Sequence, residues 1–223
     1  QLIAEGMPYR VYGGLRFFER AEIKDALAYL RLINNRNDDA SYERVVNQPT
    51  RGIGTKTVDQ LRQQARLMDV SMWQAANAMI ASGEMTARAK NALAGFLKLV
   101  HVMAEAVKDL PLQEQVEHVI HQSGLIDHYG KEKSEKAEAR VENLEELVSA
   151  AKGFEFHNED DVEMDILTAF LTHAALEAGE GQADAWEDCV QLMTLHSAKG
   201  LEFPLVFMCG MEEGLFPHQR SVE

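Results

Sequence analysis

The stretch from residue 194 to residue 203, TLHSAKGLEF, brings together side chains that could contact phosphates and a sugar hydroxyl. Hydrogen-bonding and charged groups, with a glycine that allows close approach of the backbone, come from Thr194, His196, Lys199, Gly200 and Glu202. Apolar residues precede and follow the stretch, as expected for a loop at the carboxyl end of a buried strand, where open α/β sheets bind ligands. The alternative is an ordinary surface loop with a helix-capping serine, because these residues alone specify no reaction.

A second candidate site is the turn at 49–56, PTRGIGTK, which precedes a helix predicted to begin near Thr57. Glycines before a helix N-terminus let the backbone approach a phosphate, while free N–H groups and the helix dipole favour its negative charge. The pattern is typical of a helix-hairpin-helix, which holds duplex DNA through its backbone. The residues assigned to nucleic-acid binding are Thr50, Arg51, Gly52, Ile53, Gly54, Thr55 and Lys56. The alternative is a tight turn between helices that needs glycines for positive φ.

A third candidate is the glycine turn at Gly13 and Gly14, which leads to Arg16 and to two further cations spaced by four residues, Arg20 and Lys24. Such a helical face could follow a phosphate backbone. Acidic residues are interleaved with these cations, so ordinary ion pairs along a helix explain the spacing equally well.

The remaining polar residues predict neither a catalytic group nor a metal site. His118 and His121 are three residues apart on a predicted helix but have no third ligand nearby in the sequence. The acidic run at 159–165 lacks the glycine and the ligand spacing of a calcium loop. No serine lies in a nucleophile elbow, and no G-x-x-x-x-G-K-[ST] loop is present.

The elements that must position these candidates are mainly helical. Apolar spacing predicts helices at 17–34, from 57 onward, from 72 to 80, and at 85–108, 111–124, 134–152 and 163–178. Strands are expected at 9–12 and on both sides of the 194–203 loop, with 9–12 and 204–209 side by side in one small sheet. We therefore expect a helical domain at 16–185 inserted into an α/β domain of which 1–15 and 186–223 are parts.

Charge is unevenly distributed along the 223 residues, whose formal net charge is −14. Residues 1–56 hold nine Lys or Arg against seven Asp or Glu, whereas residues 153–188 hold eleven acids and no Lys or Arg. A DNA-binding face near the N-terminal end is therefore compatible with the acidic composition. No apolar run could cross a bilayer, and the two cysteines are expected to be reduced and buried, so we expect a cytoplasmic protein without a membrane partner.

Four stretches, taken in order, carry a resemblance to a known family. They are PYRVYGGLRFFERAEIKDALAYLRL at 8–32, PTRGIG at 49–54, AFLTHAALEAGEGQAD at 169–184 and QLMTLHSAKGLEFPLVFMCGMEEGLFP at 191–217. Together they resemble the superfamily 1 DNA helicases of the UvrD, PcrA and Rep family. The resemblance covers essentially the whole chain.

The resemblance implies an architecture and a function. In that family two RecA-like domains bind ATP and Mg²⁺ between them, and the chain resembles the second helical insertion, 2B, with flanking parts of domain 2A. The intact protein would be an ATP-dependent 3′ to 5′ DNA helicase of DNA repair, with single-stranded and duplex DNA, repair proteins and further copies of itself as partners. Because the Walker A, Walker B and motif VI residues have no counterpart here, we expect the chain to be a piece of a longer protein that alone neither binds ATP nor unwinds DNA.

The resemblance also assigns roles to residues. The 194–203 loop would be helicase motif V, with Thr194 and His196 near single-stranded DNA and with Gly200 and Glu202 at the nucleotide. Gly13, Gly14 and Arg16 would also lie near the single strand, and the Gly52 to Gly54 turn would hold the duplex. The alternative is a non-enzymatic regulatory or protein-interaction domain, for which the acidic segment is the motivating feature.

Overall fold

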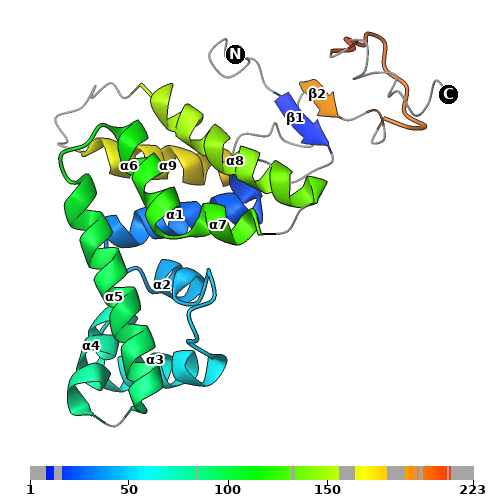
Figure 1. The fold of residues 1–223 in the computed structure, drawn as a ribbon. Coiled ribbons are helices and arrows are strands. Elements are labelled where there is room, and N and C mark those ends of the chain that lie inside the picture. The colour runs from blue at the N-terminus through cyan, green and yellow to red at the C-terminus, as the bar shows by residue number, and fades with distance from the viewer. Residues whose placement is uncertain are drawn as a thin grey trace. The chain divides into compact units, whose positions relative to one another are not determined.

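The computed structural model describes residues 9–12, 17–83, 85–131, 134–155, 164–179, 189–193, 195, 198–209 and 211. The chain divides into two compact units, one formed by 15–181 and the other by 1–14 together with 182–223. The larger unit is helical and holds the hydrophobic core, so the chain is mainly α as predicted (Figure 1).

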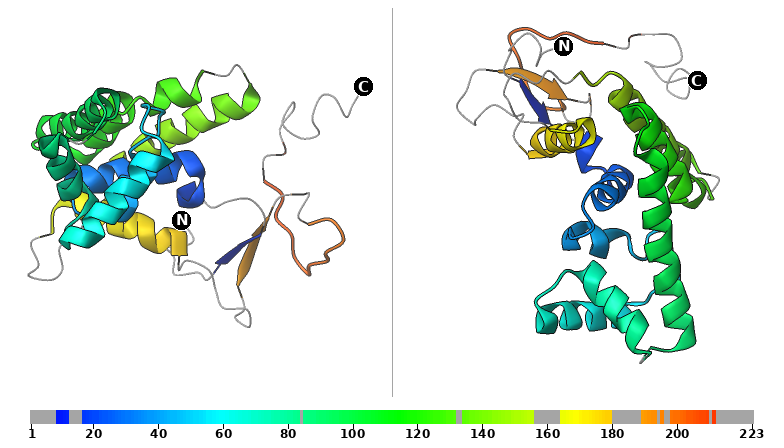
Figure 2. Two further views of the ribbon diagram at one scale, coloured as in Figure 1. Left: turned by 90° about the horizontal axis from the view of Figure 1, so that it is seen from below. Right: turned by 90° about the vertical axis from the view of Figure 1, so that its left-hand side faces the viewer.

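The helices of the larger unit follow one another with short connections. A 3₁₀ turn at Phe17–Glu19 is followed by α1 (Ala21–Asn34), α2 (Asp39–Val45), α3 (Thr55–Met68), α4 (Met72–Ser82), α5 (Ala87–Val107), α6 (Leu112–Gln122), α7 (Leu125–Tyr129), α8 (Glu135–Lys152) and α9 (Ile166–Gly179). The long helix α5 packs against α4, α1 and α6, and Figure 2 shows α3 and α4 together near one end of it. Helix α1 also packs against α2, α8 and α9, so it is the central element of this unit.

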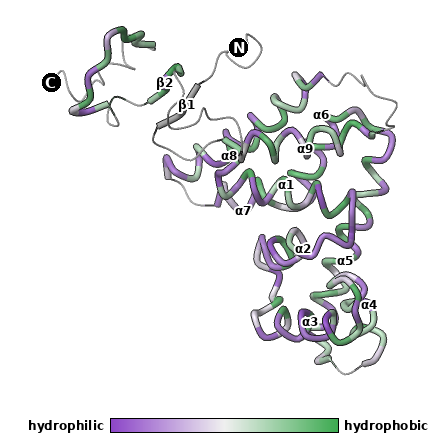
Figure 3. Tube along the Cα trace, turned by 180° about the vertical axis from the view of Figure 1, so that it is seen from behind, coloured by the Kyte–Doolittle hydropathy of each residue, from purple (hydrophilic) through white to green (hydrophobic). Residues whose placement is uncertain are grey.

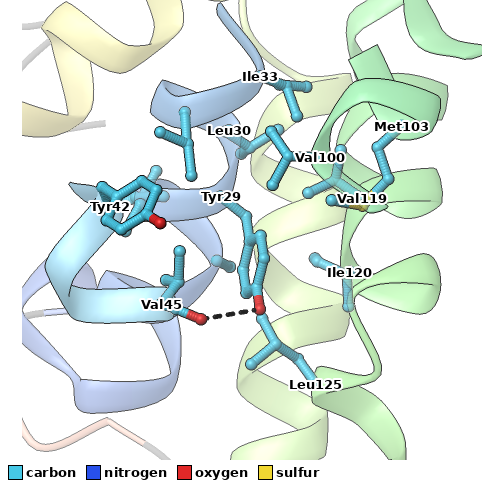
Figure 4. Packing of buried hydrophobic residues seen from close by; sticks show 14 of the residues in the cluster. Tyr29, Leu30, Ile33, Tyr42, Val45, Val100, Met103, Val119, Ile120 and Leu125 are labelled. Atoms are coloured by element: carbon cyan, nitrogen blue, oxygen red, sulfur yellow. Dashed lines mark hydrogen bonds between the residues drawn. The ribbon is translucent and has the colours of Figure 1, made fainter. Parts of the chain in front are cut away.

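The sequence pattern explains why α1 takes the central position. Ten of its 14 residues are buried, including Ile23, Leu27 and Leu30, whose spacing predicted the helix. Only Ala21, Lys24 and Asn34 of this helix are exposed, so most of its circumference has to be covered by other helices. The helices, α1 included, carry both hydrophilic and hydrophobic residues along their length (Figure 3). Figure 4 shows α1 contributing Tyr29, Leu30 and Ile33 to the packed interior.

Local signals at the helix ends are also satisfied. The Ser71 hydroxyl accepts from the Gln74 backbone N–H, and the Gln74 side chain accepts from the Ser71 N–H, which is the predicted capping box of α4. The predicted apolar face of α9 is confirmed at Phe170 and Ala174 but is wrong at Ile166, which is 41% exposed. Leu167 and Leu171 are buried in the core instead, because the buried face of α9 is centred one residue further along the helix than predicted.

The smaller unit contains a pair of parallel strands, β1 (Tyr9–Tyr12) and β2 (Val190–Met193). Tyr9 is opposite Val190, and Tyr12 is opposite Met193. The strand at 9–12 is confirmed, and the two ends of the chain do meet in one sheet. The predicted partner is wrong, because residues 204–209 form no strand and β2 pairs with β1 instead.

The prediction that the segments on both sides of the 194–203 loop are buried strands is also wrong for the described residues. Val190 and Leu192 are about 40% exposed, and the apolar residues at 205–208 are exposed by 50 to 82%. Cys189 is half-buried and Cys209 is exposed, with both thiols free. The physical reason is that a two-stranded pair offers no second layer, so neither face can be covered within the described part of this unit.

Candidate nucleic-acid interface

The turn at 49–56 connects the end of α2 to the N-terminus of α3. Gly52 has a φ of +80°, in the left-handed region that favours glycine, whereas Gly54 has a φ of −78° and acts as the N-cap of α3. A Cβ added to either glycine would meet no atom within 4 Å. Positive φ therefore explains Gly52 but not Gly54, and both glycines leave open space beside the backbone.

The first N–H groups of α3 are free to bind an acceptor. The N–H groups of Gly54, Thr55 and Lys56 donate to no other described residue, while those of Thr57 and Val58 donate to the Gly54 carbonyl at 2.9 and 3.2 Å. Free donors at the positive end of a helix favour an anion. The arrangement can therefore bind a phosphate through the backbone, without reading a base.

Ile53 and Asn47 hold this turn on the core. The Ile53 side chain is 1% exposed, so the middle of the turn is anchored by apolar burial. The Asn47 Oδ1 accepts from the backbone N–H of Arg51 at 2.8 Å and from that of Ile53 at 3.1 Å. These anchors leave Thr50, Gly52, Gly54, Thr55 and Lys56 exposed in the structure.

Arg51 lies differently from the other residues predicted at this site. Its guanidinium is half-buried and donates to the carbonyls of Pro49 at 2.9 Å, Ser123 at 2.8 Å and Val45 at 3.4 Å. The guanidinium carbon is 5.7 Å from the ring centroids of both Tyr29 and Phe96. Arg51 therefore points into the protein, whereas the exposed Lys56 makes no ion pair with another described residue.

Beside the turn, α2 and α3 enclose a hollow of about 350 Å³ that Asn47, Ile53 and Thr55 help to line. Its two carboxylates, Glu43 and Asp59, both pair with Arg62, and these bonds raise the pKa of the Arg62 guanidinium. One guanidinium thus offsets part of the negative charge of these two carboxylates, which lowers the electrostatic cost of bringing a phosphate to the turn.

A polar network lies beneath the turn. The Tyr129 hydroxyl donates to Asp25 at 2.7 Å, and Asp25 also forms an ion pair with Arg44 at 2.7 Å. The Gln48 side chain contacts the Tyr129 hydroxyl at 3.3 Å. Burial and the bond to Asp25 raise the pKa of Tyr129 well above its ordinary value, so this hydroxyl stays protonated over the physiological range. The network joins the residues before the turn to α1 and α7.

Part of the other two candidate sites lies outside the described residues. This applies to Gly13, Gly14 and Arg16, and to Thr194 and His196 in the predicted loop. Arg20 is described, and its guanidinium binds Asn143 of α8 and lies over the Phe17 ring. Lys24 lines a hollow of about 430 Å³ with Arg31 and Arg44.

The described end of the 194–203 loop is a turn with an exposed carboxylate. The Leu201 N–H donates to the Ala198 carbonyl at 3.0 Å, and Gly200 has a φ of +83°. Lys199 and Glu202 are both exposed, so the Glu202 carboxylate is free to accept a hydrogen bond from a ribose hydroxyl. Among the described residues there is no group of three His, Cys, Asp or Glu that could hold a metal ion.

Residues 1–223 match the protein family described as UvrD-like helicase C-terminal domain. The chain belongs to this family. Over the whole of the present chain, it is 57% identical to DNA helicase II of Escherichia coli and 56% identical to DNA helicase II of Haemophilus influenzae. It is also 40% identical to the ATP-dependent DNA helicase PcrA of Bacillus subtilis over 99% of the chain. The UvrD-like chain spans only about three tenths of the length of these relatives, 31% for the Escherichia coli protein.

Four residues of this UvrD-like domain that contact Arg51 were not predicted from the sequence. They are Asn47, Ser123, Tyr29 and Phe96. Asn47 alone had a local signal, since an Asn side chain often bonds to backbone N–H groups a few residues away. The other three are 22 to 72 residues from Arg51 in the chain, and no spacing rule connects them to it.

No described helix is long and apolar enough to cross a membrane.

Proposed function

We propose that this chain is the duplex-binding part of an ATP-dependent 3′ to 5′ DNA helicase that acts in DNA repair. Residues 16–185 would be the 2B insertion, and 1–15 with 186–223 would be parts of the RecA-like domain 2A. The observation that carries the proposal is the row of free N–H groups at Gly54, Thr55 and Lys56, on an exposed turn of a chain that belongs to a helicase family. Division of the chain into two units supports the domain assignment.

In this proposal the turn binds the duplex without reading its sequence. The backbone N–H groups donate to one phosphate, and Lys56 adds a positive charge beside it. Such contacts hold the DNA backbone in any sequence, as an enzyme that moves along DNA requires. Binding would be weak at physiological salt, with a Kd of roughly 1 to 100 µM, because most of the affinity is electrostatic.

The 194–203 loop would connect the nucleotide to the single strand. Glu202 would accept from the ribose hydroxyl, and the Gly200 turn would let the backbone approach the nucleotide. ATP and its Mg²⁺, when bound by the longer protein, supply the free energy of phosphoryl transfer. Thr194 and His196 would bind the phosphates of the single strand, as would Gly13, Gly14 and Arg16. One exposed carboxylate is too little to hold ATP, so the chain alone should be inactive.

Duplex binding can be tested by fluorescence anisotropy with a labelled hairpin duplex, titrated at several salt concentrations. We expect weak binding with a steep salt dependence, and Gly52→Glu should abolish it by placing a negative charge beside the phosphate site. A matched control is Gly83→Glu, because Gly83 has a similar φ of +75° and equally open space but lies at the end of α4. The control should bind DNA like the unaltered chain.

Two results would contradict the proposal. One is absence of duplex binding at low salt by the folded chain, and the other is equal loss of binding in both glutamate variants. Capture of protein partners by a chain with no DNA affinity would instead favour the regulatory or interaction domain.

A further inference from the structure

We propose that Arg51 is a positioning residue that shapes the turn for DNA, and that its guanidinium does not contact a phosphate. This inference rests on the proposed function of the turn and assigns a different role to one of its cations. An arginine beside a glycine turn would ordinarily be expected to bind phosphate directly. The geometry points to the opposite direction for this side chain.

Three backbone carbonyls surround the Arg51 guanidinium. Three of its five N–H donors are engaged by carbonyls from three parts of the unit: the end of α2, the turn itself and the connection between α6 and α7. One of these acceptors, the Ser123 carbonyl, belongs to a residue that is only 3% exposed. To reach a phosphate, Arg51 would have to leave three charge-assisted bonds, and the carbonyls would lose their donor.

The positive charge of Arg51 lies between two aromatic rings of the hydrophobic core. The guanidinium carbon lies 5.7 Å from the centroids of the Tyr29 and Phe96 rings, whose side chains are fully buried. The Tyr29 hydroxyl in turn donates to the Gln48 carbonyl at 2.6 Å, on the other side of Pro49. Arg51 therefore connects the residues before the glycines to α1 and α5, through groups that are already packed in place.

The contacts of Arg51 also restrain the backbone of the turn. The Arg51 N–H is held by Asn47 while its side chain is held by carbonyls, so the residue before Gly52 is fixed at both ends. With Ile53 buried next to it, the chain enters α3 in one defined path, and the free N–H groups of Gly54, Thr55 and Lys56 are oriented before DNA arrives. Preorganised donors lose less conformational freedom on binding.

The slope of log Kd against log salt separates positioning from direct contact. Each phosphate neutralised by a protein cation contributes about 0.9 to that slope for duplex DNA. We expect Lys56→Met to reduce the slope by about this amount, since Lys56 is exposed beside the site. Arg51→Met should weaken binding about tenfold or more with an unchanged slope. Arg51→Lys should be no better than Arg51→Met, because lysine keeps the charge but cannot engage three carbonyls between two rings.

A matched control is Arg140→Met. Arg140 also lies over a tyrosine ring, 5.2 Å from the centroid of Tyr129, and is close to a carboxylate, but it belongs to α8. If Arg51 only stabilised the fold, both methionine variants would bind DNA normally at temperatures where they are folded. We expect normal affinity for Arg140→Met and reduced affinity for Arg51→Met under those conditions.

A measurement on the unaltered chain decides the question if Arg51→Met does not fold. In NMR spectra recorded during titration with the duplex, the backbone amides of Gly54, Thr55 and Lys56 should shift, and the side-chain Nε–H of Arg51 should not. A large shift of Arg51 Nε–H, a slope reduced in Arg51→Met as in Lys56→Met, restored affinity in Arg51→Lys, or unchanged affinity in folded Arg51→Met would each overturn the inference. Failure of the unaltered chain to bind duplex would instead refute the proposed function itself.

Discussion

At the scale of single residues, the two glycines of the turn differ although they are only two positions apart. Gly52 needs a left-handed conformation that costs other residues about 1 to 2 kcal/mol, whereas Gly54 has a φ that every residue adopts. What the two share is open space where a Cβ would lie. We therefore expect the two glycines to contribute differently to stability, although both leave space for DNA to approach the backbone.

We expect Gly52→Ala to lower the free energy of unfolding by about 1 kcal/mol, because alanine is strained at a φ of +80°. Gly54→Ala should change it by less than about 0.5 kcal/mol, since the small loss at the N-cap is offset by a less flexible unfolded chain. Urea unfolding followed by circular dichroism measures both. Equal destabilisation by the two substitutions would show that backbone conformation is not what requires Gly52.

The buried hydroxyl of Tyr42 is a second feature at this scale. Tyr42 is fully buried, its ring is edge-on to Phe96 at 5.4 Å, and its hydroxyl has no hydrogen-bond partner in the part of the chain that is described. Burial, with a smaller contribution from Asp39, raises its pKa well above the ordinary value of 10. The folded state therefore holds this proton more tightly than the unfolded state. The free energy of unfolding is independent of this group below pH 10 and falls as the pH rises above 10, where the unfolded state loses the proton first.

Tyr42→Phe should raise the free energy of unfolding at pH 7 by up to about 1 kcal/mol, because an unpaired buried hydroxyl is removed without changing the ring. The variant should also lose less stability than the unaltered chain between pH 10 and 11.5. Chemical unfolding across this pH range tests both statements. Tyr29→Phe is the contrasting variant, since the Tyr29 hydroxyl donates to the Gln48 carbonyl at 2.6 Å, and its loss should lower the free energy of unfolding at pH 7.

At the scale of elements, the helix ends carry signals that act within a few residues. The capping box of α4 satisfies two backbone N–H groups that the helix itself cannot. Its serine also contacts the Asn37 side chain at 2.8 Å, which joins the start of α4 to the segment before α2. The cap therefore contributes to the helix and to its attachment.

Ser71→Ala should lower the free energy of unfolding by about 1 kcal/mol, the usual cost of losing a serine cap. Ser149→Ala is the matched control, because Ser149 is an exposed serine inside α8 whose hydroxyl donates only to the carbonyl of Glu145. Alanine has the higher helix propensity, so the control should be neutral or slightly stabilising. Thermal unfolding of the two variants gives the comparison, and an unchanged Ser71→Ala would refute the importance of the cap.

At the scale of the whole molecule, stability is expected to reside in one unit. Every residue of the hydrophobic core cluster lies between Ile23 and Ala174, while large apolar side chains at 190–208 are exposed in the described part of the other unit. Burial of apolar area is the main favourable contribution to folding. In β2, Val190 and Leu192 are about 40% exposed, so this strand adds little burial.

The segment 15–181 should therefore fold without the rest of the chain. We expect its Tm to lie within about 3 °C of the Tm of residues 1–223, equivalent to about 1 kcal/mol for a domain of this size. Calorimetry of the two proteins makes the comparison. A segment that unfolds without cooperativity would mean that β1, β2 or the residues around them contribute to the core.

Much of the helical unit was accessible from sequence, because its signals are local. The apolar spacing of α1 and α5, the capping box of α4 and the helix after the glycine turn each depend on residues within one or two turns. The helix after the turn begins at Thr55 instead of near Thr57, and the short helices α2 and α7 were not predicted, since seven and five residues give little periodicity. Membership of the helicase family also followed from ordered motifs in the sequence.

The partner of β1 and the direction of Arg51 depended on tertiary structure. Two apolar segments, 190–193 and 204–209, flank the 194–203 loop; the second was predicted to pair with β1, and the structure pairs the first. Arg51 has the same charge and the same neighbours in sequence whether it points outward to a phosphate or inward to the Ser123 carbonyl. The inward direction depends on Tyr29, Phe96 and Ser123, which long-range packing brings together, and local sequence carries no record of that packing.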